Sequence, residues 1–302
     1  MRNAYLEELY KIASKDKQVL SLVADNGMIV YDDFRKDMPN QFFNFGISEG
    51  HMVSAAAGMA LCGKIPFLYT ISSFLAYRAY EFIRVDVCLQ NANVKIIGIG
   101  TGVSYGYLGP THHTTEDIGL LRALPNLTIF SPGSDYEARE SVQAAYQIQG
   151  PVYIRLGNGS LKDSQEEHCP FYPGKGRRIR DGKDMAVITT GAILREVEKA
   201  AEMLSADGIE VQVISMHTLK PFDEDIIEQA AKTGTIVVVE EHNSTGGLAD
   251  AVAGAVAVRG LQTKFLKIGL ADCFAKGYGN EDEVRKQNGL NGEAIYKKIR
   301  EI

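Results

Sequence analysis

The sequence predicts an α/β protein built from two doubly wound domains. Short apolar runs alternate with amphipathic stretches in two successive blocks, and this alternation is typical of mostly parallel sheets with helices on both faces. The length of 302 residues also suggests about two domains. From Gly157 onwards the chain becomes rich in Gly, Pro and Ser, which is typical of a linker. We therefore expect a first domain over 1–160, a linker over 161–184 and a second domain over 185–302.

The first block contains five runs that predict strands, because each is short, apolar and bounded by turn-forming residues. Four longer stretches carry apolar residues at helical spacing. The expected strands cover 19–24, 67–70, 95–100, 127–131 and 152–156, and the expected helices cover 50–61, 74–90, 116–124 and 136–149.

The second block repeats the alternation without repeating the sequence of the first block. Asp223 stands directly before an apolar run, so it is expected to be the N-cap of a helix. The expected strands cover 185–190, 209–215, 235–239 and 264–268, and the expected helices cover 192–205, 223–232 and 248–258.

Charge and cysteine content exclude several classes of function. A net charge of −6 without a basic run argues against binding to nucleic acid or to an anionic membrane. The four cysteines are widely scattered with no CxxC pair, which argues against a disulfide framework and a structural zinc site. The first residues lack the apolar segment of a signal peptide, and no apolar run is long enough to span a membrane. We therefore expect a cytoplasmic protein.

A glycine-rich loop follows the strand expected at 95–100 and reads IGIGTGVSYGYLG over 97–109. It lacks the spacing of a dinucleotide-binding fingerprint, because Val103 and Tyr105 occupy the positions that require a small residue. Ligands nevertheless bind at the carboxyl ends of strands in open α/β sheets, so the loop is either a flexible turn or part of a site.

Glu49 begins an apolar helix and allows two interpretations. It is either a first-turn acid stabilised by the helix dipole, or a partly buried acid that shares a proton with a ligand nitrogen. The same choice arises for Phe74, Tyr77 and Tyr80, which follow one another at i, i+3 and i+6. Aromatic residues at this spacing either pack in the core or form a stacking wall for a flat ring.

Two adjacent histidines, His112 and His113, follow a Gly109–Pro110 turn. Neighbouring residues do not readily converge on one metal ion and no third ligand is near in sequence, so a zinc site is not expected. A loop histidine near the end of a strand is either a proton-transfer group or a surface residue. The segment 240–242, Glu-Glu-His, ends an apolar strand and is either a second site or its polar termination.

Considered together, these segments resemble one family. The motifs GISEGHMVSAAAGMA (46–60), SFLAYRAY (73–80) and GPTHH (109–113) resemble the thiamine diphosphate pyrimidine-binding domain of transketolases, and residues 185–248 resemble the transketolase C-terminal domain. The resemblance covers only the latter half of a full-length transketolase, because the GDG segment that precedes the metal-binding Asn in the other half is absent.

The resemblance therefore implies one subunit of a split transketolase. Such a subunit works with an N-terminal transketolase subunit, as an α2β2 heterotetramer, on small sugars. The cofactor implied is thiamine diphosphate, with Mg²⁺ or Ca²⁺ bound through the diphosphate mainly by the partner subunit and no metal ligand in this chain.

The roles of individual residues also follow from the resemblance. Glu49 matches the glutamate that hydrogen-bonds the aminopyrimidine and so helps to activate the cofactor. Phe74 and Tyr77 match the aromatic pair around the pyrimidine, and Tyr80 matches the tyrosine that follows them. Asp25 resembles an aspartate at the border of the cofactor site.

His112 matches the histidine that contacts the substrate and moves a proton at the reacting carbonyl. Three other substrate positions differ from those of phosphosugar transketolases. Leu108 replaces an aspartate, Asn158 replaces the arginine that grips the phosphate, and Gly100 stands where a histidine is usual. Losing charged donors weakens a phosphate site, so we expect an acceptor other than a simple terminally phosphorylated aldose.

The implied activity is transfer of a two-carbon ketol unit from a ketose to an aldose. Two enzymatic alternatives share the same domains: a 1-deoxyxylulose-5-phosphate-synthase-like enzyme and the beta subunit of a 2-oxo acid dehydrogenase. A non-catalytic partner subunit is the third alternative, and Glu49 and His112 argue against it because a scaffold needs neither residue.

Overall fold

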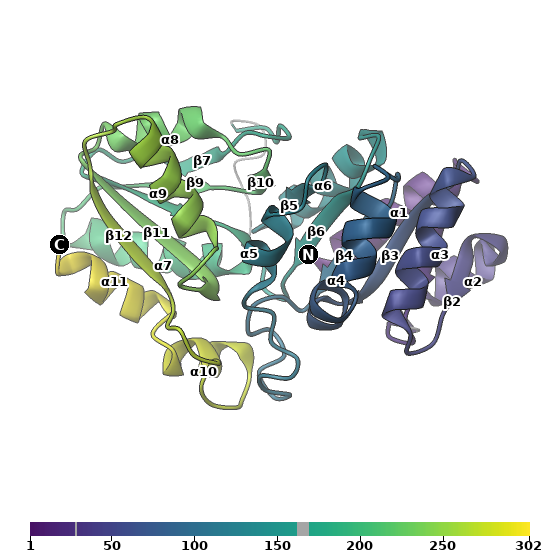
Figure 1. The fold of residues 1–302 in the computed structure, drawn as a ribbon. Coiled ribbons are helices and arrows are strands. Elements are labelled where there is room, and N and C mark those ends of the chain that lie inside the picture. Colours follow the sequence, from purple (N-terminus) through teal and green to yellow (C-terminus); the bar gives the residue numbers. More distant parts are fainter. Residues whose placement is uncertain (28, 162–168) are drawn as a thin grey trace.

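The computed structural model describes residues 1–27, 29–161 and 169–302, which form two α/β domains side by side (Figure 1). None of the helices in these residues is long and apolar enough to cross a membrane. The elements are α1 (Arg2–Ala13), β1 (Val19–Val23), α2 (Asp32–Asp37), β2 (Phe42–Asn44), α3 (Glu49–Leu61), β3 (Ile65–Ile71), α4 (Tyr80–Phe82), β4 (Lys95–Ile99), α5 (Asp117–Arg122), β5 (Thr128–Phe130), α6 (Asp135–Gln147), β6 (Val152–Leu156), β7 (Arg177–Arg180), β8 (Met185–Thr189), α7 (Leu194–Ala206), β9 (Val211–Ser215), β10 (Thr218–Lys220), α8 (Glu224–Ala231), β11 (Thr235–Asn243), α9 (Leu248–Val258), β12 (Lys264–Leu270), α10 (Glu281–Gln287) and α11 (Gly292–Arg300).

The first domain is built on a sheet with the strand order β10-β5-β6-β4-β3-β1-β2. All of its strands except β10 run parallel, and Val19 of β1 lies opposite Ile65 of β3. Side chains alternate between the faces, so Leu20 and Leu22 pack on one side and Val23 on the other. Because both faces are covered, the strands read as continuous apolar runs, which is why the sequence predicts most of them.

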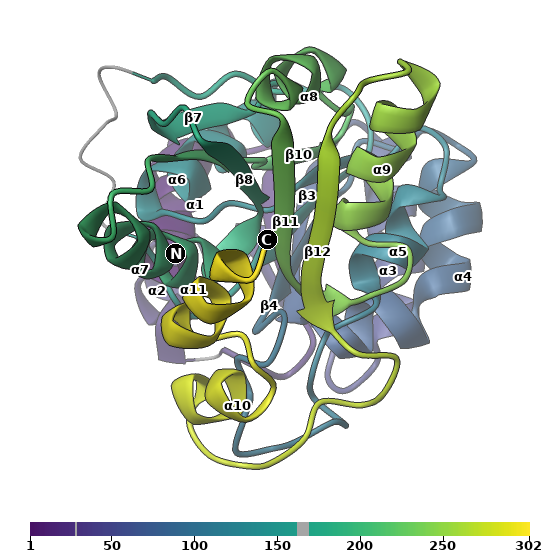
Figure 2. The ribbon, with the colours of Figure 1, turned by 90° about the vertical axis from the view of Figure 1, so that its left-hand side faces the viewer.

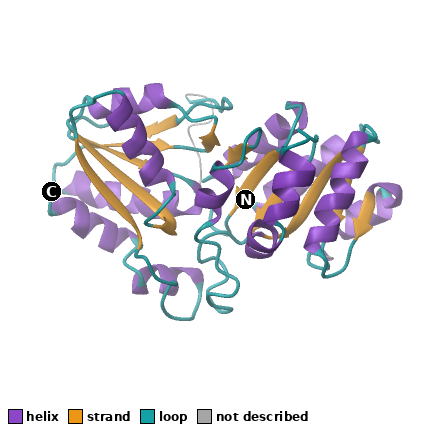
Figure 3. Cartoon of the chain, viewed as in Figure 1, coloured by secondary structure: helices purple, strands orange, loops and turns teal. Residues whose placement is uncertain are grey.

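Helices form a layer on each face of this sheet (Figure 3). Apolar residues of α3, α5 and the segment between β3 and β4 pack on one face, and those of α1, α2 and α6 pack on the other. The doubly wound arrangement expected from the sequence is therefore confirmed for the first domain.

The second sheet has the order β12-β11-β8-β9-β7, with β7 antiparallel to β9. Its faces are covered by α7 and α11 on one side and by α8 and α9 on the other (Figure 2). The Asp223 side chain caps α8 by accepting a hydrogen bond from the Ile226 backbone N–H, as predicted.

Strand β7 lies inside the segment expected to be a linker. Its Arg177 is 1% exposed and forms an ion pair with Glu137 of α6 at 3.0 Å, while Ile179 packs in the second core. The sequence RRIR does not look like a buried strand because three of its four residues are charged. Arg177 can be buried there because Glu137 of the first domain neutralises it. Residues 162–168 of the expected linker lie outside the described residues.

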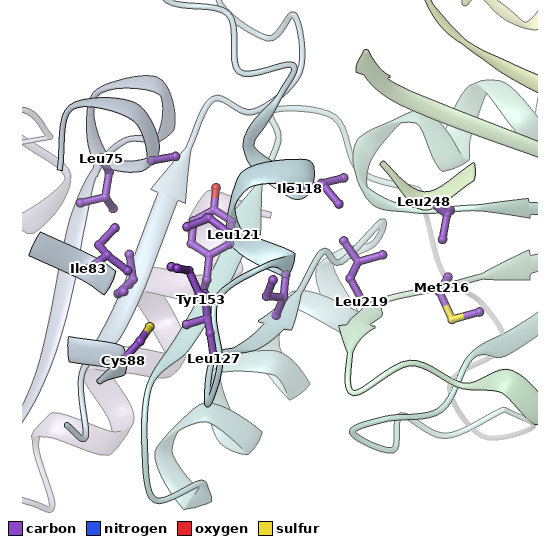
Figure 4. Packing of buried hydrophobic residues seen from close by; sticks show 14 of the residues in the cluster. Leu75, Ile83, Cys88, Ile118, Leu121, Leu127, Tyr153, Met216, Leu219 and Leu248 are labelled. Carbon is purple, nitrogen blue, oxygen red and sulfur yellow. The ribbon is translucent and has the colours of Figure 1, made fainter. Parts of the chain in front are cut away.

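The two domains share a core. Strand β10 follows β9 in sequence but pairs antiparallel with β5, so Thr218 lies opposite Phe130 of the first sheet. One apolar cluster runs through both domains, and Figure 4 shows α5 residues Ile118 and Leu121 between Tyr153 and Leu219. The loops at this side of the first domain therefore rest on the second domain.

The α-helix expected over 74–90 is wrong in part. The segment consists of a π-helix over Phe74–Arg78, the short α4, and a second π-helix over Ile83–Cys88. A π-helix has a wider turn than an α-helix, so residues three apart no longer share one face. This change decides where the aromatic side chains of the segment lie.

Candidate functional site

The candidate site lies at the carboxyl edge of the first sheet. Strands β1, β2, β3, β4 and β6 run parallel, so the loops that follow them meet at one edge. These loops and the helix that begins at Glu49 carry all the residues predicted for the cofactor and substrate, which are Asp25, Glu49, Phe74, Tyr77, Tyr80, Leu108, His112 and Asn158.

Glu49 is the first residue of α3 and is 2% exposed. Its Oε2 accepts a hydrogen bond of 2.8 Å from Nη1 of Arg78, whose side chain is 54% exposed. The Arg78 guanidinium also lies 5.0 Å from the centre of the Phe74 ring. A buried carboxylate needs such a partner, and here the partner reaches it from the solvent side.

His112 is held between two aromatic rings. Its ring centre lies 5.1 Å from that of Phe74 and 6.1 Å from that of Tyr105, both in edge-to-face geometry. Thr111 Oγ1 lies 2.9 Å from His112 Nδ1, which fixes the rotation of the imidazole. The arrangement leaves Nε2 as the ring nitrogen for an external ligand.

Tyr77 and Tyr80 do not form a continuous stacking surface with Phe74, because their hydroxyl groups are hydrogen-bonded to the segment 115–120. The Tyr77 hydroxyl accepts hydrogen bonds from the backbone N–H groups of Thr115 and Glu116 and donates to the Glu116 carboxylate. Burial, followed by the nearby carboxylates, raises the pKa of Tyr77. The Tyr80 hydroxyl donates to the Leu120 carbonyl at 3.2 Å. Both tyrosines therefore hold the segment that contains α5.

Asp25 is exposed and has a φ of 57°. Its backbone N–H donates to the Asn44 side chain at 3.0 Å, which joins the loops after β1 and β2. Asp and Asn tolerate this left-handed conformation better than other residues with a side chain.

Leu108 and Asn158 belong to one loop system. Leu108 is 49% exposed on the loop that carries His112. The Asn158 side chain is exposed, and its Nδ2 donates to the Ser104 carbonyl at 3.2 Å. Leu108 and Asn158, two of the three expected substrate positions, are thus connected through the loop over 100–113, which also contains the third, Gly100.

Glu49, Phe74 and Ser73 together could receive a flat ring that carries a hydrogen-bonding nitrogen, as the pyrimidine of the expected cofactor does. Glu49 offers a buried acceptor whose present partner is an exposed side chain, and Phe74 offers a half-buried ring beside it. Ser73 Oγ, next to Phe74, is buried without a hydrogen-bond partner, which is typical of a polar atom that meets a ligand or water. Among the described residues, no group of three or more His, Cys, Asp or Glu side chains is placed to hold a metal ion.

The predictions from the sequence did not include Arg78 or the buried ion pair between Arg155 and Asp117. Arg155 and Asp117 are buried, with 2.9 Å between Nε and Oδ2, and Arg155 Nη2 also donates to the Thr114 and Glu241 carbonyls. Two features of the sequence could have indicated them. Arg78 is a cation inside the aromatic run SFLAYRAY, and Arg155 is a charged residue inside the apolar strand β6.

The segment 240–242 lies inside β11, where the register with β12 shifts between Val239 and Asn243, and it joins the domains. Glu240 accepts hydrogen bonds from the backbone N–H groups of Leu248 and Ala249, so it caps α9. His242 Nε2 accepts from the Gly119 N–H at 3.3 Å. The strand continues to Asn243, so the expected polar termination is wrong, and these contacts give Glu240 and His242 structural roles.

Two family models cover the chain. "Transketolase, pyrimidine binding domain" matches residues 1–163 and "Transketolase, C-terminal domain" matches residues 174–295. A putative transketolase C-terminal section from Methanocaldococcus jannaschii is 38% identical, with 100% of this chain and 95% of the relative covered. One of the subunits of an apulose-4-phosphate transketolase from Actinobacillus succinogenes is 34% identical, with 98% and 96% covered.

A solved structure agrees with these relatives. The chain resembles one described as "Split gene transketolase, inactive beta4 tetramer" with a TM-score of 0.88 and 33% identity, covering 99% of this chain and 96% of the other. The similarity extends through both domains, so the fold and the order of the domains are shared.

Proposed function

The chain belongs to the transketolase family, and from this premise we propose that it is the C-terminal subunit of a split, thiamine diphosphate-dependent transketolase. Residues 1–160 form its pyrimidine-binding domain, and its C-terminal domain begins at β7 rather than at 185, because β7 belongs to the second sheet. The relatives of equal length support this proposal, because they are named as a C-terminal section or as one subunit of a transketolase.

The observation that carries the proposal is the placement of Glu49, Phe74 and His112 at one sheet edge. When bound, thiamine diphosphate supplies the nucleophilic carbon for breaking and remaking a carbon–carbon bond. Glu49 is placed to hold a proton at a pyrimidine nitrogen, because its burial excludes the water that would weaken this interaction. Phe74 lies beside Glu49 as a flat apolar contact for the ring.

His112 is the proposed proton-transfer group at the substrate. It lies in edge-to-face contact with Phe74, so its imidazole is next to the ring against which the pyrimidine is proposed to pack. Imidazole is suited to proton transfer near neutral pH, and Thr111 fixes its orientation. Tyr77 and Tyr80 contribute by holding the segment around α5 in place.

The diphosphate and its Mg²⁺ or Ca²⁺ belong to an N-terminal partner subunit in this proposal. An α2β2 heterotetramer, located in the cytoplasm, would bring the two halves together. Exposed apolar side chains after β1 and β2 support a partner at this edge, since Ile29 is 84% and Ile47 is 78% exposed.

Co-expression with the product of the neighbouring gene tests the proposal, followed by a screen of ketose donors and aldehyde acceptors with thiamine diphosphate and magnesium. Ketol transfer without release of carbon dioxide is expected. Pyruvate as the preferred donor, with carbon dioxide released, would instead identify a synthase or decarboxylase of the same domain family. No reaction with any donor would favour a non-catalytic subunit.

A further inference from the structure

The loop over 100–113, which carries His112, is packed into the second domain. Val103 is fully buried in the core cluster that contains Val284 and Ala275. A side-chain carbon at Gly106 would come within 2.5 Å of the Gly279 carbonyl oxygen, so only glycine allows this approach. The loop and the segment that leads into α10 lie side by side in Figures 1 and 2.

Beneath the loop lies a buried triad of charges from the second domain, Glu241–Arg285–Glu281. Arg285 is 0% exposed, and its Nε donates to Glu241 Oε1 at 2.7 Å while its Nη2 donates to Glu281 Oε1 at 2.6 Å. Glu241 belongs to β11 and Glu281 begins α10. Removing the shared cation would leave the buried Glu241 carboxylate uncompensated and the part-buried Glu281 with Arg195 as its cation, at 4.0 Å.

The triad contacts the loop at two points. Ser104 Oγ lies 3.1 Å from Glu281 Oε1 and 2.7 Å from the Thr101 carbonyl oxygen, two acceptors that share its one hydrogen, and it accepts from the Asn158 backbone N–H at 3.2 Å. At Gly102, a side-chain carbon would come within 2.0 Å of Glu241 Oε2, so the carboxylate lies directly against the loop backbone. Gly102 and Thr114 exchange two backbone hydrogen bonds of 2.9 Å, which close the loop around His112.

We propose that Arg285 is a positioning residue, which fixes the substrate loop and His112 through the triad without touching the substrate. The inference rests on the proposed function in one respect, that His112 acts on the substrate. A misplacement of about 1 Å at a reacting group lowers a rate about 100-fold, so a rigid support under this loop has a direct effect on turnover. The second domain thereby contributes to catalysis although it carries none of the proposed cofactor or substrate residues.

Hydrogen–deuterium exchange on the isolated chain tests the support itself. Arg285→Met breaks the triad, and Ser104→Ala removes the link while leaving the triad intact. In both variants we expect exchange at the Gly102 and Thr114 amides to become at least ~10-fold faster, because these amides open when the loop is released. Arg285→Lys keeps the charge and should restore part of the protection.

Arg259→Met is the matched control. Like Arg285, Arg259 pairs with carboxylates of the second domain, but these three, Glu224, Asp225 and Glu228, lie on its surface. Its loss should leave exchange in the loop unchanged. Unchanged loop exchange in Ser104→Ala and Arg285→Met would overturn the proposal.

Kinetics of the assembled enzyme form the second arm. For Ser104→Ala and Arg285→Met we expect kcat to fall at least ~10-fold while the dissociation constant of thiamine diphosphate stays within about twofold, because Glu49 and Phe74 lie on other segments. A parallel loss of cofactor affinity would overturn the positioning role. The two arms can also disagree. If loop exchange becomes faster in the variants but the assembled wild type transfers no ketol unit, the proposed function is rejected while the supporting role of Arg285 stands.

Discussion

Arg78 donates a hydrogen bond to the buried carboxylate of Glu49, with 2.8 Å between Nη1 and Oε2. The pair combines a carboxylate that is 2% exposed with a guanidinium that is 54% exposed. The acid is therefore neutralised by a group that is free to move into solvent. We therefore expect a ligand nitrogen that binds Glu49 from the same side to replace this guanidinium.

Removing the Arg78 guanidinium should strengthen cofactor binding. The exposed half of this pair, Arg78, is screened by solvent, so the pair contributes on the order of 1 kcal/mol, which corresponds to about fivefold in a dissociation constant. We expect Arg78→Met in the assembled enzyme to bind thiamine diphosphate up to about fivefold more tightly by calorimetry. Arg84→Met, at an exposed position of the same segment, is the control and should have no effect. Weaker binding in Arg78→Met would show that Arg78 holds the cofactor instead of competing with it.

Glu49→Gln tests the proton-sharing acid. The amide keeps the size of the side chain but does not hold a proton at a ring nitrogen in the same way, so turnover of the assembled enzyme should fall at least ~100-fold. Steady-state kinetics at saturating thiamine diphosphate measure the effect. Glu81→Gln, at an exposed position near the same site, should retain full turnover. Near-normal turnover in Glu49→Gln would remove Glu49 from the mechanism.

Leu108 and Asn158 predict weak use of simple phosphorylated aldoses. A phosphate that lacks an arginine loses about 2–3 kcal/mol of charged hydrogen bonding, or about one to two decades of affinity. Specificity constants for ribose 5-phosphate and erythrose 4-phosphate should therefore fall below ~10⁴ M⁻¹s⁻¹. Asn158→Arg should raise both constants if the position faces the phosphate. Efficient use of either sugar by the wild type would show that these two residues do not exclude phosphosugars.

His217 predicts a loss of stability in mild acid. Burial, with a smaller contribution from Arg177, lowers the pKa of His217 to about 3, and its ring stacks on Phe171 at 4.0 Å. The unfolded chain binds this proton near pH 6.5, so the free energy of unfolding decreases as the pH falls from about 6.5 towards about 3. Between pH 7.5 and pH 5, this group should lower the free energy of unfolding by about 2 kcal/mol.

Urea unfolding of wild type and His217→Phe at both pH values measures this effect. The variant should lose about 2 kcal/mol less than the wild type on acidification, whatever its stability at pH 7.5. Equal losses in the two proteins would mean that His217 is not the group responsible.

Features set by a local pattern were predictable from the sequence. The central strands of both sheets, such as β4 and β8, are apolar runs covered on two faces, and Asp223 caps α8 because its side chain reaches the N–H of a residue three positions later. Glu49 is the first residue of α3, where the helix dipole favours an acid. These features depend on neighbours within a few residues, and a single sequence contains that information.

Features that depend on contacts between distant segments were not predictable. β7 and β10 are short and polar, and each becomes a strand only because a strand from elsewhere in the chain lies beside it. The pairing of Arg78 with Glu49 depends on a π-helix, whose wider turn sets Tyr77 apart from Phe74. Arg285 reaches Glu241 across 44 positions, so no local spacing indicates the triad.

Calorimetry with thiamine diphosphate tests the central claim, that this chain supplies the pyrimidine half of a site completed by a partner subunit. The isolated chain and its complex with the N-terminal subunit are titrated in parallel, each with and without magnesium. We expect weak, magnesium-independent binding to the isolated chain and tight, magnesium-dependent binding to the complex. Tight, magnesium-dependent binding to the isolated chain would contradict the account.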